Sequence, residues 1–370
     1  MVVSSGFPSE KYPLLGIFEF DQAQALARKG CHVVFLAVDL RSIFRWRKWG
    51  IVKGSKNGVD YYIYNLPLGR LPIKFLCKLG ELGLNRLYKI ASKIHGKPDV
   101  LHAHFTEMGC ITSRLSAKEG IPYVVTEHSS KINQYVIGRD LRDCAIEAYR
   151  DAQSVIAVGT SLSNNILKHT GIKSIVIPNI INTELFFQCK RLKHTGFRLV
   201  TTSNLIILKR TWQILQALAM INPKEIDYYL TVIGDGPERD TIEYWIKALK
   251  LEDRVYVAGY KPREEIASIY EKSDAFIMVS SSETFGVAYV EAMAAGLPVI
   301  ATRCGGPEDF VNNNNGYLID VDDISQLSSA ITQLYNNENY YKTDDLRQFV
   351  KNNYSPEVVA EQLLNVYKSI

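Results

Sequence analysis

The 370-residue sequence contains no uninterrupted run of about 18 or more apolar residues, so it offers no candidate for a membrane-spanning helix. Its first residues, Met1 to Gly6, are too few and too uncharged for a secretory signal peptide. No acidic DxD pair is expected at a strand end, so the sequence does not require a divalent metal. These absences predict a globular protein that remains in the cytoplasm.

Cysteine is sparse, and no two cysteines form a CxxC pair. The six positions are Cys31, Cys77, Cys110, Cys144, Cys189 and Cys304. Their spacing disfavours a disulfide framework and a zinc site, and it predicts reduced, mostly buried thiols. His102 and His104 form an HxH pair on one face of a predicted strand, but no third ligand is apparent. A hydrogen-bonded pair is therefore favoured over zinc.

Acidic residues are scarce in the first half of the chain. Residues 1–180 contain 24 Lys and Arg against 14 Asp and Glu, whereas residues 181–370 contain 19 against 25. Within residues 41–97 the counts are 13 and 2, and aromatic and aliphatic side chains are interleaved at near-helical spacing. This segment predicts attachment to an anionic membrane surface, and a solvated basic face over a core helix is an equally good interpretation. Basic charge without a recognised nucleic-acid motif disfavours nucleic acid.

The length exceeds that of one ordinary hydrophobic core, so two domains are expected. In both halves, short apolar segments alternate with amphipathic ones. The expected strands include Val2 to Ser5, His32 to Val38, Val59 to Tyr64, Val100 to Ala103, Tyr123 to Thr126, Arg198 to Thr202, Tyr229 to Ile233 and Ala275 to Val279. Each half therefore predicts a doubly wound parallel sheet, with a linker near Pro178-Asn179.

Two glutamates eight positions apart, Glu283 and Glu291, lie in the most informative segment. The apolar residues before Glu283 predict a buried strand, and the Ala-rich stretch after Gly286 predicts a helix that Gly296 and Pro298 close. In such a unit, ligands bind beyond the carboxyl ends of the strands, and helix-start N–H groups attract phosphate. Glu283 is then expected beside a phosphate site, with Glu291 about 12 Å along the helix. Taken alone, the pair fits ordinary solvated helix charges better.

The surrounding residues change this interpretation. The sequence from Glu283 to Thr302 resembles, almost position for position, the E-x7-E signature of the family 4 retaining glycosyltransferases, and a weaker resemblance extends along the whole chain. The resemblance implies an α/β protein of glycosyltransferase-B architecture, in which two doubly wound Rossmann-like domains face each other across a cleft. Residues 1–180 would form the acceptor-side domain and residues 181–352 the nucleotide-sugar-binding domain. A final helix within residues 353–370 would cross back to the first domain.

The resemblance also implies how a nucleoside-diphosphate sugar is bound. Glu291 would accept hydrogen bonds from the ribose hydroxyls, and Glu283 would hold the hydroxyls of the transferred sugar. The backbone of the residues that follow Glu283 would bind the diphosphate, and Gly286 would permit its close approach. These residues are Thr284, Phe285, Gly286 and Val287.

Positive charge near the leaving pyrophosphate comes, by the same resemblance, from a loop after the first strand of the second domain. Lys209 matches the lysine of that loop, whereas Asn204 stands where the family has an arginine. Arg210 follows at a glycine position of the family, and its direction cannot be read from the spacing. An ordinary surface Lys-Arg pair is the alternative.

Further positions match the family more weakly. His128, at the end of a predicted strand, matches a histidine that approaches the donor sugar, and a structural histidine is the alternative. The family usually has two glycines in the loop after the first strand, and in this chain Gly16 is the one that matches. Gly234 and Gly236 would border the nucleotide, and Tyr260 would contact the base. Because the third glycine of a dinucleotide fingerprint is missing, a Rossmann oxidoreductase is disfavoured.

We therefore expect a retaining, metal-independent hexosyltransferase with His128, Glu283 and Lys209 as catalytic residues, no cofactor, and a UDP- or GDP-linked sugar as donor. In the expected front-side route, the leaving phosphate helps to deprotonate the acceptor. The acceptor is expected to be a glycan or a lipid-linked glycan in capsule, lipopolysaccharide or exopolysaccharide assembly at the inner face of the plasma membrane. The alternatives are a soluble small-molecule acceptor, a sugar-nucleotide epimerase of the same fold and a catalytically silent sugar-nucleotide binding protein.

Overall fold

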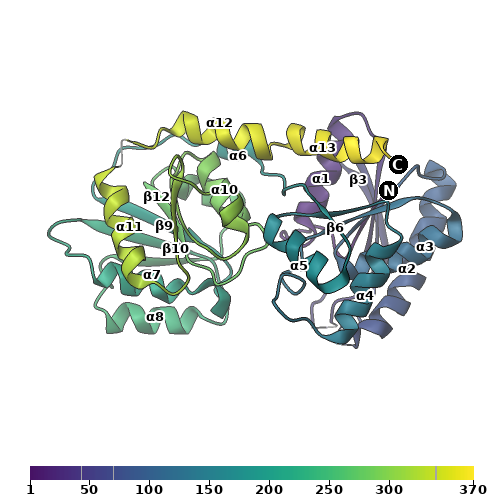
Figure 1. Cartoon of the computed structure of the whole chain (residues 1–370), viewed down its shortest axis with the longest axis horizontal. Coiled ribbons are helices and arrows are strands. Elements are labelled where there is room, and N and C mark those ends of the chain that lie inside the picture. The colour runs from purple at the N-terminus through teal and green to yellow at the C-terminus, as the bar shows by residue number, and fades with distance from the viewer. Residues whose placement is uncertain (43, 70, 338–339) are drawn as a thin grey trace. The chain divides into compact units, whose positions relative to one another are not determined.

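The computed structural model describes residues 1–42, 44–69, 71–337 and 340–370 of the chain (Figure 1). These residues form two compact units, one comprising Met1–Ile180 with Pro356–Ile370 and the other comprising Ile181–Ser355. Within this described part of the chain, no helix is both long enough and apolar enough to cross a bilayer.

The first unit is built on an eight-stranded sheet in the order β3-β4-β2-β1-β5-β6-β7-β8. Its strands are β1 (Val2–Ser4), β2 (Val33–Asp39), β3 (Gly50–Lys56), β4 (Val59–Asn65), β5 (Leu101–His104), β6 (Tyr123–Glu127), β7 (Ser154–Ala157) and β8 (Ile175–Val176). Neighbouring strands run parallel except β3 and β4, which form an antiparallel hairpin. Asn57 and Gly58 close this hairpin with φ angles of 53° and 79°, the positive values that a tight two-residue turn requires.

Helices cover both faces of this sheet, with α1 and α13 on one face and α2, α3 and α4 on the other (Figure 1). The helices are α1 (Ile17–Arg28), α2 (Ile73–His95), α3 (Thr106–Glu119), α4 (Arg139–Arg150), α5 (Thr160–Thr170) and α13 (Pro356–Lys368). Phe20 of α1 and Leu363 of α13 are fully buried in one cluster with Phe35 of β2. The last helix of the chain is therefore part of the core of the first unit.

The second unit has a six-stranded parallel sheet in the order β11-β10-β9-β12-β13-β14. Its strands are β9 (Phe197–Thr202), β10 (Tyr228–Ile233), β11 (Val255–Gly259), β12 (Ala275–Met278), β13 (Val299–Thr302) and β14 (Gly316–Ile319). Its helices are α6 (Thr183–Phe186), α7 (Thr211–Ala219), α8 (Arg239–Ala248), α9 (Arg263–Tyr270), α10 (Val287–Ala294), α11 (Ile324–Asn336) and α12 (Thr343–Tyr354). β12 is apolar and buried at every position, as expected of a strand covered on both faces.

In each sheet the strand order reverses once, between β1 and β5 in the first unit and between β9 and β12 in the second. The connections leave in opposite directions on the two sides of such a point. Ligands of open α/β sheets bind there, beyond the carboxyl ends of the strands. The loops that follow β1, β5, β9 and β12 are consequently the first places to look for a site.

The predicted α/β class, with two Rossmann-like parallel sheets, is confirmed. The hairpin strand β3 departs from the purely parallel first sheet that the sequence predicted. Its residues include Gly50, Lys53, Gly54 and Lys56 and are mostly exposed, so no apolar run marks the strand. At the other boundary, α12 continues to Tyr354, so the second unit ends at Ser355 and not at residue 352.

Candidate active site

The loops after β9 and β12 meet through an ion pair between Lys209 and Glu283. Lys209 Nζ lies 2.5 Å from Glu283 Oε1, and Ser280 Oγ donates to the same oxygen at 2.6 Å. The Ser281 N–H donates to the Leu208 carbonyl at 2.8 Å, which ties the two loop backbones together. The Lys209 and Glu283 side chains are 20% and 11% exposed, so the pair is partly shielded from solvent. The sheet topology thus places a cation and a carboxylate side by side.

The backbone around Glu283 is held on both sides. Its N–H donates to the Cys304 carbonyl at 3.0 Å, and its carbonyl accepts from the Gly306 N–H at 2.9 Å. A Cβ on Gly306 would lie 2.4 Å from the Phe285 carbonyl oxygen, so only glycine permits this close contact. The loop that carries Glu283 is therefore fixed by backbone hydrogen bonds to the loop after β13.

Helix α10 begins directly after Gly286. Gly286 has a φ of 97°, and a Cβ there would lie 2.7 Å from Tyr289 Cδ2, so the position requires glycine. No side chain of the described residues caps the helix start, so the first N–H groups of α10, which follow Glu283 in the same loop, have no capping side chain. Thr284 and Val287 are half-buried there, whereas the Phe285 ring is buried in the core and anchors the loop.

Glu291 lies in α10 and is only 6% exposed. Arg263 Nε, from the first residue of α9, lies 3.3 Å from Glu291 Oε1. Arg263 was not among the site residues expected from the sequence. Its place at a helix start shortly after Tyr260, which follows β11 and is 50% exposed, was the available signal. The structure thus adds a half-buried cation to the environment of Glu291.

Gly234 and Gly236 allow two loops of the second unit to touch. A Cβ on Gly234 would lie 1.8 Å from the Ser203 carbonyl oxygen, and one on Gly236 would lie 2.4 Å from the Leu205 carbonyl oxygen. The Leu205 N–H donates to the Asp235 carbonyl at 3.0 Å. These glycines are required by the packing of the chain itself, whatever ligand the loops bind. Asn204, between the two contacts, is exposed.

Arg210 is directed to Asp322, with which its guanidinium forms an ion pair. Gln213 Nε2 donates to the same Asp322 oxygen at 2.6 Å, and these contacts lower the pKa of the Asp322 carboxyl. Asp320 and Asp322 follow β14, so a DxD pair does stand at a strand end, contrary to the sequence analysis, which did not predict β14. Arg303 Nε lies 3.4 Å from the Asp320 carboxylate, so both aspartates have basic partners.

In the first unit, Gly16 precedes α1 with a φ of 69°, and a Cβ there would lie 2.4 Å from the Gly6 carbonyl oxygen. Gly16 therefore allows the loop after β1 to close on itself. Glu19, in the first turn of α1, is 3% exposed and accepts a hydrogen bond from Ser4 Oγ at 3.0 Å. Burial raises the pKa of Glu19 to about 7. The sequence analysis did not assign a role to this buried carboxyl.

His128 belongs to a chain of buried imidazoles. Its Nε2 lies 3.0 Å from His104 Nδ1, and the His104 ring stacks on His102 with centroids 4.4 Å apart. His102 in turn contacts Tyr367 Oη at 2.5 Å and Thr126 Oγ1 at 2.7 Å. Burial lowers the pKa of His128 to about 4 and that of His102 to about 3. The rings are therefore neutral at pH 7.

Glu127 holds the backbone that carries His128. This fully buried carboxylate accepts hydrogen bonds from the N–H groups of His128 and Ser129 at 2.9 and 2.7 Å. The hydroxyls of Thr106 and Tyr149 donate to its other oxygen. Burial raises the pKa of Glu127. The loop after β6 is thereby fixed by one side chain that the sequence analysis did not identify.

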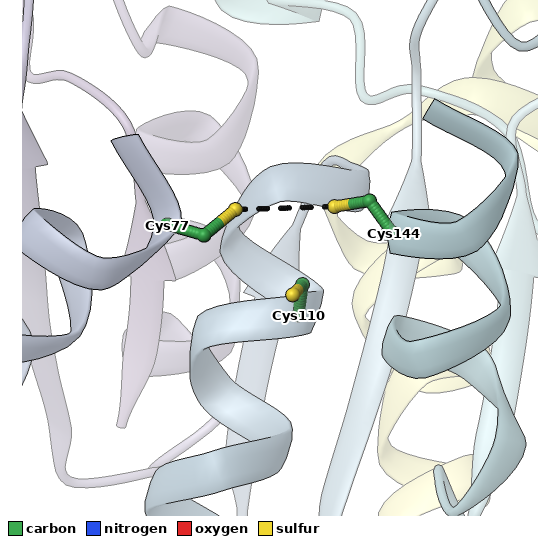
Figure 2. Close-up of side chains that lie close together, drawn as sticks. All are labelled: Cys77, Cys110 and Cys144. Carbon is green, nitrogen blue, oxygen red and sulfur yellow. Dashed lines mark hydrogen bonds between the residues drawn. The ribbon is translucent and has the colours of Figure 1, made fainter. Parts of the chain in front are cut away.

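Three of the cysteines that are separated in the sequence meet in the first unit (Figure 2). Cys77 lies on α2, Cys110 on α3 and Cys144 on α4, and all three are buried. The Sγ atoms of Cys77 and Cys144 are 4.0 Å apart. Spacing in the sequence gave no sign of this cluster.

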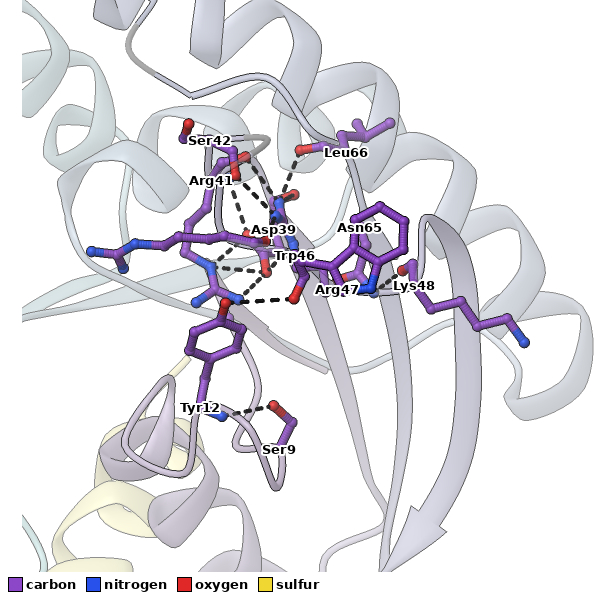
Figure 3. Close-up of polar contacts among 12 residues, drawn as sticks. Ser9, Tyr12, Asp39, Arg41, Ser42, Trp46, Arg47, Lys48, Asn65 and Leu66 are labelled. Atoms are coloured by element: carbon purple, nitrogen blue, oxygen red, sulfur yellow. Dashed lines mark hydrogen bonds and ion pairs between the residues drawn. The ribbon is translucent and has the colours of Figure 1, made fainter.

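Asp39, the last residue of β2, anchors the start of the basic segment (Figure 3). Its buried carboxylate pairs with Arg41 Nη2 at 2.6 Å and with Arg47 Nε at 2.7 Å. Arg47 also donates to the carbonyls of Arg41 and Leu66 at 3.1 and 3.0 Å, and its side chain is only 8% exposed. Arg47 therefore shapes the loop and does not face solvent.

The segment of residues 41–97 nevertheless exposes aromatic and basic side chains together. Its exposed members include Phe44, Arg45, Trp46, Lys48, Trp49, Phe75, Lys78 and Leu82. The last three share one face of α2, since residues three and four apart on a helix are neighbours. Residues 43 and 70 and the side chain of residue 74 lie outside the described part of the segment.

Two family models match the chain. The model described as Glycosyl transferases group 1 matches residues 182–355, and the model described as Glycosyltransferase Family 4 matches residues 19–185. N-acetyl-alpha-D-glucosaminyl L-malate synthase of Bacillus anthracis is 30% identical over 292 residues, which cover 74% of this chain and 75% of that protein. The chain belongs to the family 4, group 1 glycosyltransferases.

Other comparisons span this glycosyltransferase from end to end. The putative teichuronic acid biosynthesis glycosyltransferase TuaC of Bacillus subtilis is 25% identical, and the match covers 100% of this chain and 97% of TuaC. The solved structure of Anabaena Alr3699/HepE in complex with UDP has a TM-score of 0.76 at 18% identity, and the match covers 100% of this chain and 99% of that one. The predicted family and the glycosyltransferase-B fold are thereby confirmed.

The buried imidazoles predict how the stability of this glycosyltransferase depends on pH. His102 and His128 are neutral when folded, with pKa values of about 3 and about 4 against 6.5 in the unfolded chain. Their contribution to the free energy of unfolding is fully present at a pH above 6.5, the pKa in the unfolded chain. It decreases as the pH falls towards 4, by about 2 kcal/mol for each ring between about pH 6.5 and 5. Urea unfolding of wild type and His102→Gln at about pH 7.5 and 5 measures this, because glutamine offers a donor and an acceptor without titrating.

The variant should lose less stability on acidification than wild type. Glu19 acts in the opposite direction, since burial raises the pKa of its carboxyl to about 7, so the folded chain binds this proton more tightly than the unfolded chain and acidification favours folding. Glu19 is unchanged in both proteins, so it cancels in the comparison. Equal losses in the two proteins would contradict a neutral, buried His102.

Proposed function

We propose that this glycosyltransferase is a retaining, metal-independent hexosyltransferase that uses a nucleoside-diphosphate sugar, with UDP as the favoured nucleotide. The observation that carries the proposal is the Lys209–Glu283 ion pair at the reversal point of the second sheet, in the loop that leads to the start of α10. A cation, helix-start N–H groups and a carboxylate in one loop cluster suit the diphosphate and the sugar of such a donor.

The charge that develops on the leaving phosphate during transfer determines the roles of Lys209 and Glu283. When the bond between the sugar and the β-phosphate breaks, negative charge grows on the leaving phosphate, and the Lys209 ammonium stabilises it. Together with the N–H groups of Gly286 and Val287, Lys209 supplies the charge that a divalent metal would otherwise provide. Glu283, now paired with Lys209, exchanges part of that contact for hydrogen bonds from the sugar hydroxyls.

The remaining assignments use the geometry of each unit by itself. Glu291 is a buried carboxylate beside Arg263 and accepts hydrogen bonds from the ribose hydroxyls. His128 is neutral at pH 7, because burial lowers its pKa to about 4, so it acts on the donor sugar as a hydrogen-bonding partner and not as a cation. Retention follows a front-side route in which the leaving phosphate oxygen takes the proton of the acceptor hydroxyl.

The acceptor is proposed to be a glycan or lipid-linked glycan of a surface polysaccharide, handled at the cytoplasmic face of the membrane. The end-to-end match to TuaC, named for teichuronic acid biosynthesis, supports this class of acceptor. The exposed aromatic and basic residues of segment 41–97 support attachment to an anionic surface. UDP as the nucleotide is supported by its presence in the HepE structure.

A soluble acceptor is the second candidate. The Bacillus anthracis relative, the one with 30% identity, is named for a product that joins N-acetylglucosamine to L-malate. A small hydroxy acid would need no membrane attachment, so the vesicle experiment below separates the two acceptor classes.

Glu283 and Glu291 should respond differently to removal of their charge. Glu291→Gln should weaken the binding of UDP by about 2 kcal/mol, the scale of a charged hydrogen bond, while keeping the shape of the buried site. Glu283→Gln should leave the affinity for UDP unchanged, because UDP lacks the sugar, and should lower turnover of the UDP-sugar. Calorimetric titration and donor hydrolysis measure the two effects, with the exposed Glu264→Gln on α9 as the matched control. Unchanged UDP affinity in folded Glu291→Gln would contradict the ribose assignment.

Lys209 and its neighbour Arg210 provide a sharper comparison. Lys209→Ala should lower turnover by about 100-fold or more, because it removes the charge that stabilises the leaving group. Arg210→Ala should have a much smaller effect, since its guanidinium is held by Asp322. Donor turnover at saturating UDP-sugar measures both variants. Similar losses in the two, or near-normal turnover in Lys209→Ala, would place the leaving group elsewhere.

Membrane attachment is tested by co-sedimentation with anionic and neutral vesicles. Replacing Arg45, Lys48 and Lys78 with serine should release the protein from anionic vesicles, at about 1 kcal/mol for each basic residue, while donor hydrolysis is unchanged. Arg47 is left intact because it holds the loop together. The control exchanges three exposed basic residues elsewhere on the same unit, Lys118, Arg150 and Lys173. Equal release by both variants, or no binding by wild type, would favour the soluble acceptor.

A further inference from the structure

The cysteine cluster of the first unit, Cys77, Cys110 and Cys144, has no part in the proposed transfer reaction. The three Sγ atoms all lie within 4.8 Å of one another, and those of Cys77 and Cys144 are 4.0 Å apart. Each thiol comes from a different helix, and the Cys77 and Cys144 thiols point towards each other with Cys110 beside them (Figure 2). Their exposed fractions are 3%, 1% and 7%.

The spacing of the sulfurs fits a cation better than a disulfide. A zinc ion about 2.3 Å from each of three thiolates holds the sulfurs about 3.8 to 4.0 Å apart, whether the site is tetrahedral or trigonal. The separation of Cys77 and Cys144 has this value already, and the third sulfur needs a shift of under about 1 Å. A disulfide needs a sulfur separation of about 2.05 Å, so any pair would have to approach by roughly 2 Å and would leave the third thiol unused.

A guanidinium and an entry path lie beside the cluster. Arg114 Nη2 lies 3.7 Å from Cys110 Sγ, and Glu147 and Glu81 hold the guanidinium at 2.6 and 3.0 Å. A cavity of about 240 Å³ adjoins all three cysteines and is also lined by Asp140, Asp143 and Glu147. The cavity gives a cation a path inwards, and it provides carboxylate oxygens or a water for a fourth ligand.

We propose that Cys77, Cys110 and Cys144 bind one zinc ion through three thiolates, with the fourth position facing the adjoining cavity. Binding converts three thiols into thiolates and releases three protons, so the zinc and its three sulfur ligands together carry one negative charge and lie beside the Arg114 guanidinium. The ion connects the first turns of α2 to α3 and α4. Because Cys77 lies between Phe75 and Lys78, it also fixes the part of α2 that carries exposed aromatic and basic residues.

The test uses the full chain, purified with a reductant and a chelator and then freed of both. Cobalt(II) serves as the probe, because its thiolate complexes absorb in the near ultraviolet and visible range. Wild type should bind one cobalt ion per chain with thiolate charge-transfer absorption, and zinc should displace it. Cys77→Ser, Cys110→Ser and Cys144→Ser should each weaken binding by about 100-fold or more, since one of three thiolates is lost. Cys31→Ser and Cys189→Ser, outside the cluster, should bind as wild type does.

Two results would overturn the proposal. The first is that cobalt gives no more charge-transfer absorption with wild type than with the triple variant that has serine at all three positions. The second is that Cys110→Ser binds cobalt as tightly as wild type does. Should a serine variant fail to fold, alkylation of the wild-type chain decides the question. Zinc should protect Cys77, Cys110 and Cys144 and leave the other three of the six cysteines reactive to the extent that their burial allows. Loss of two cluster thiols to a disulfide, with no protection by zinc, also contradicts the zinc site.

Discussion

The parallel pairing of β9 with β12 is the interaction on which the candidate site of the second unit depends. Phe276 lies in register with Val200, and the loops that follow the two strands leave the sheet side by side. Lys209 and Glu283 come from these loops, so their ion pair exists because two distant segments share backbone hydrogen bonds. A pair placed by a buried sheet is held in one geometry before any ligand arrives, which is the condition for electrostatic stabilisation of a leaving group.

In the first unit, buried carboxylates hold the loops that follow the strands. Asp39 ends β2, Glu127 ends β6, and Glu19 contacts Ser4 at the end of β1. A carboxylate accepts several hydrogen bonds, so one residue satisfies donors of a whole loop that burial would otherwise leave unpaired. Burial of these carboxyl groups removes them from water, and this desolvation raises the pKa values of Glu127 and Glu19. The loops of the first unit thus owe their shape to single buried carboxyl groups.

The fold was predictable because its signals are local and repeated. Apolar runs such as Ala275–Met278 mark strands, and the glycine at Gly286 marks a helix start whose φ of 97° only glycine adopts readily. The hairpin strand β3 was not predicted, because it lies at an edge and carries exposed glycine and lysine where an apolar pattern would be needed. Arg263 was missed as the partner of Glu291, since its contact joins two helices that are adjacent only in the folded unit.

The family, the two parallel sheets and the residues of the E-x7-E segment follow from residue types at short spacing along the chain. The partner of each charge depends on the folded chain: Lys209 pairs with Glu283, and Arg210 pairs with Asp322 although the two basic residues are adjacent. The same holds for the cluster of Cys77, Cys110 and Cys144. Partners of this kind come from separate elements, so the packing of those elements, and not the spacing along the chain, brings the atoms together.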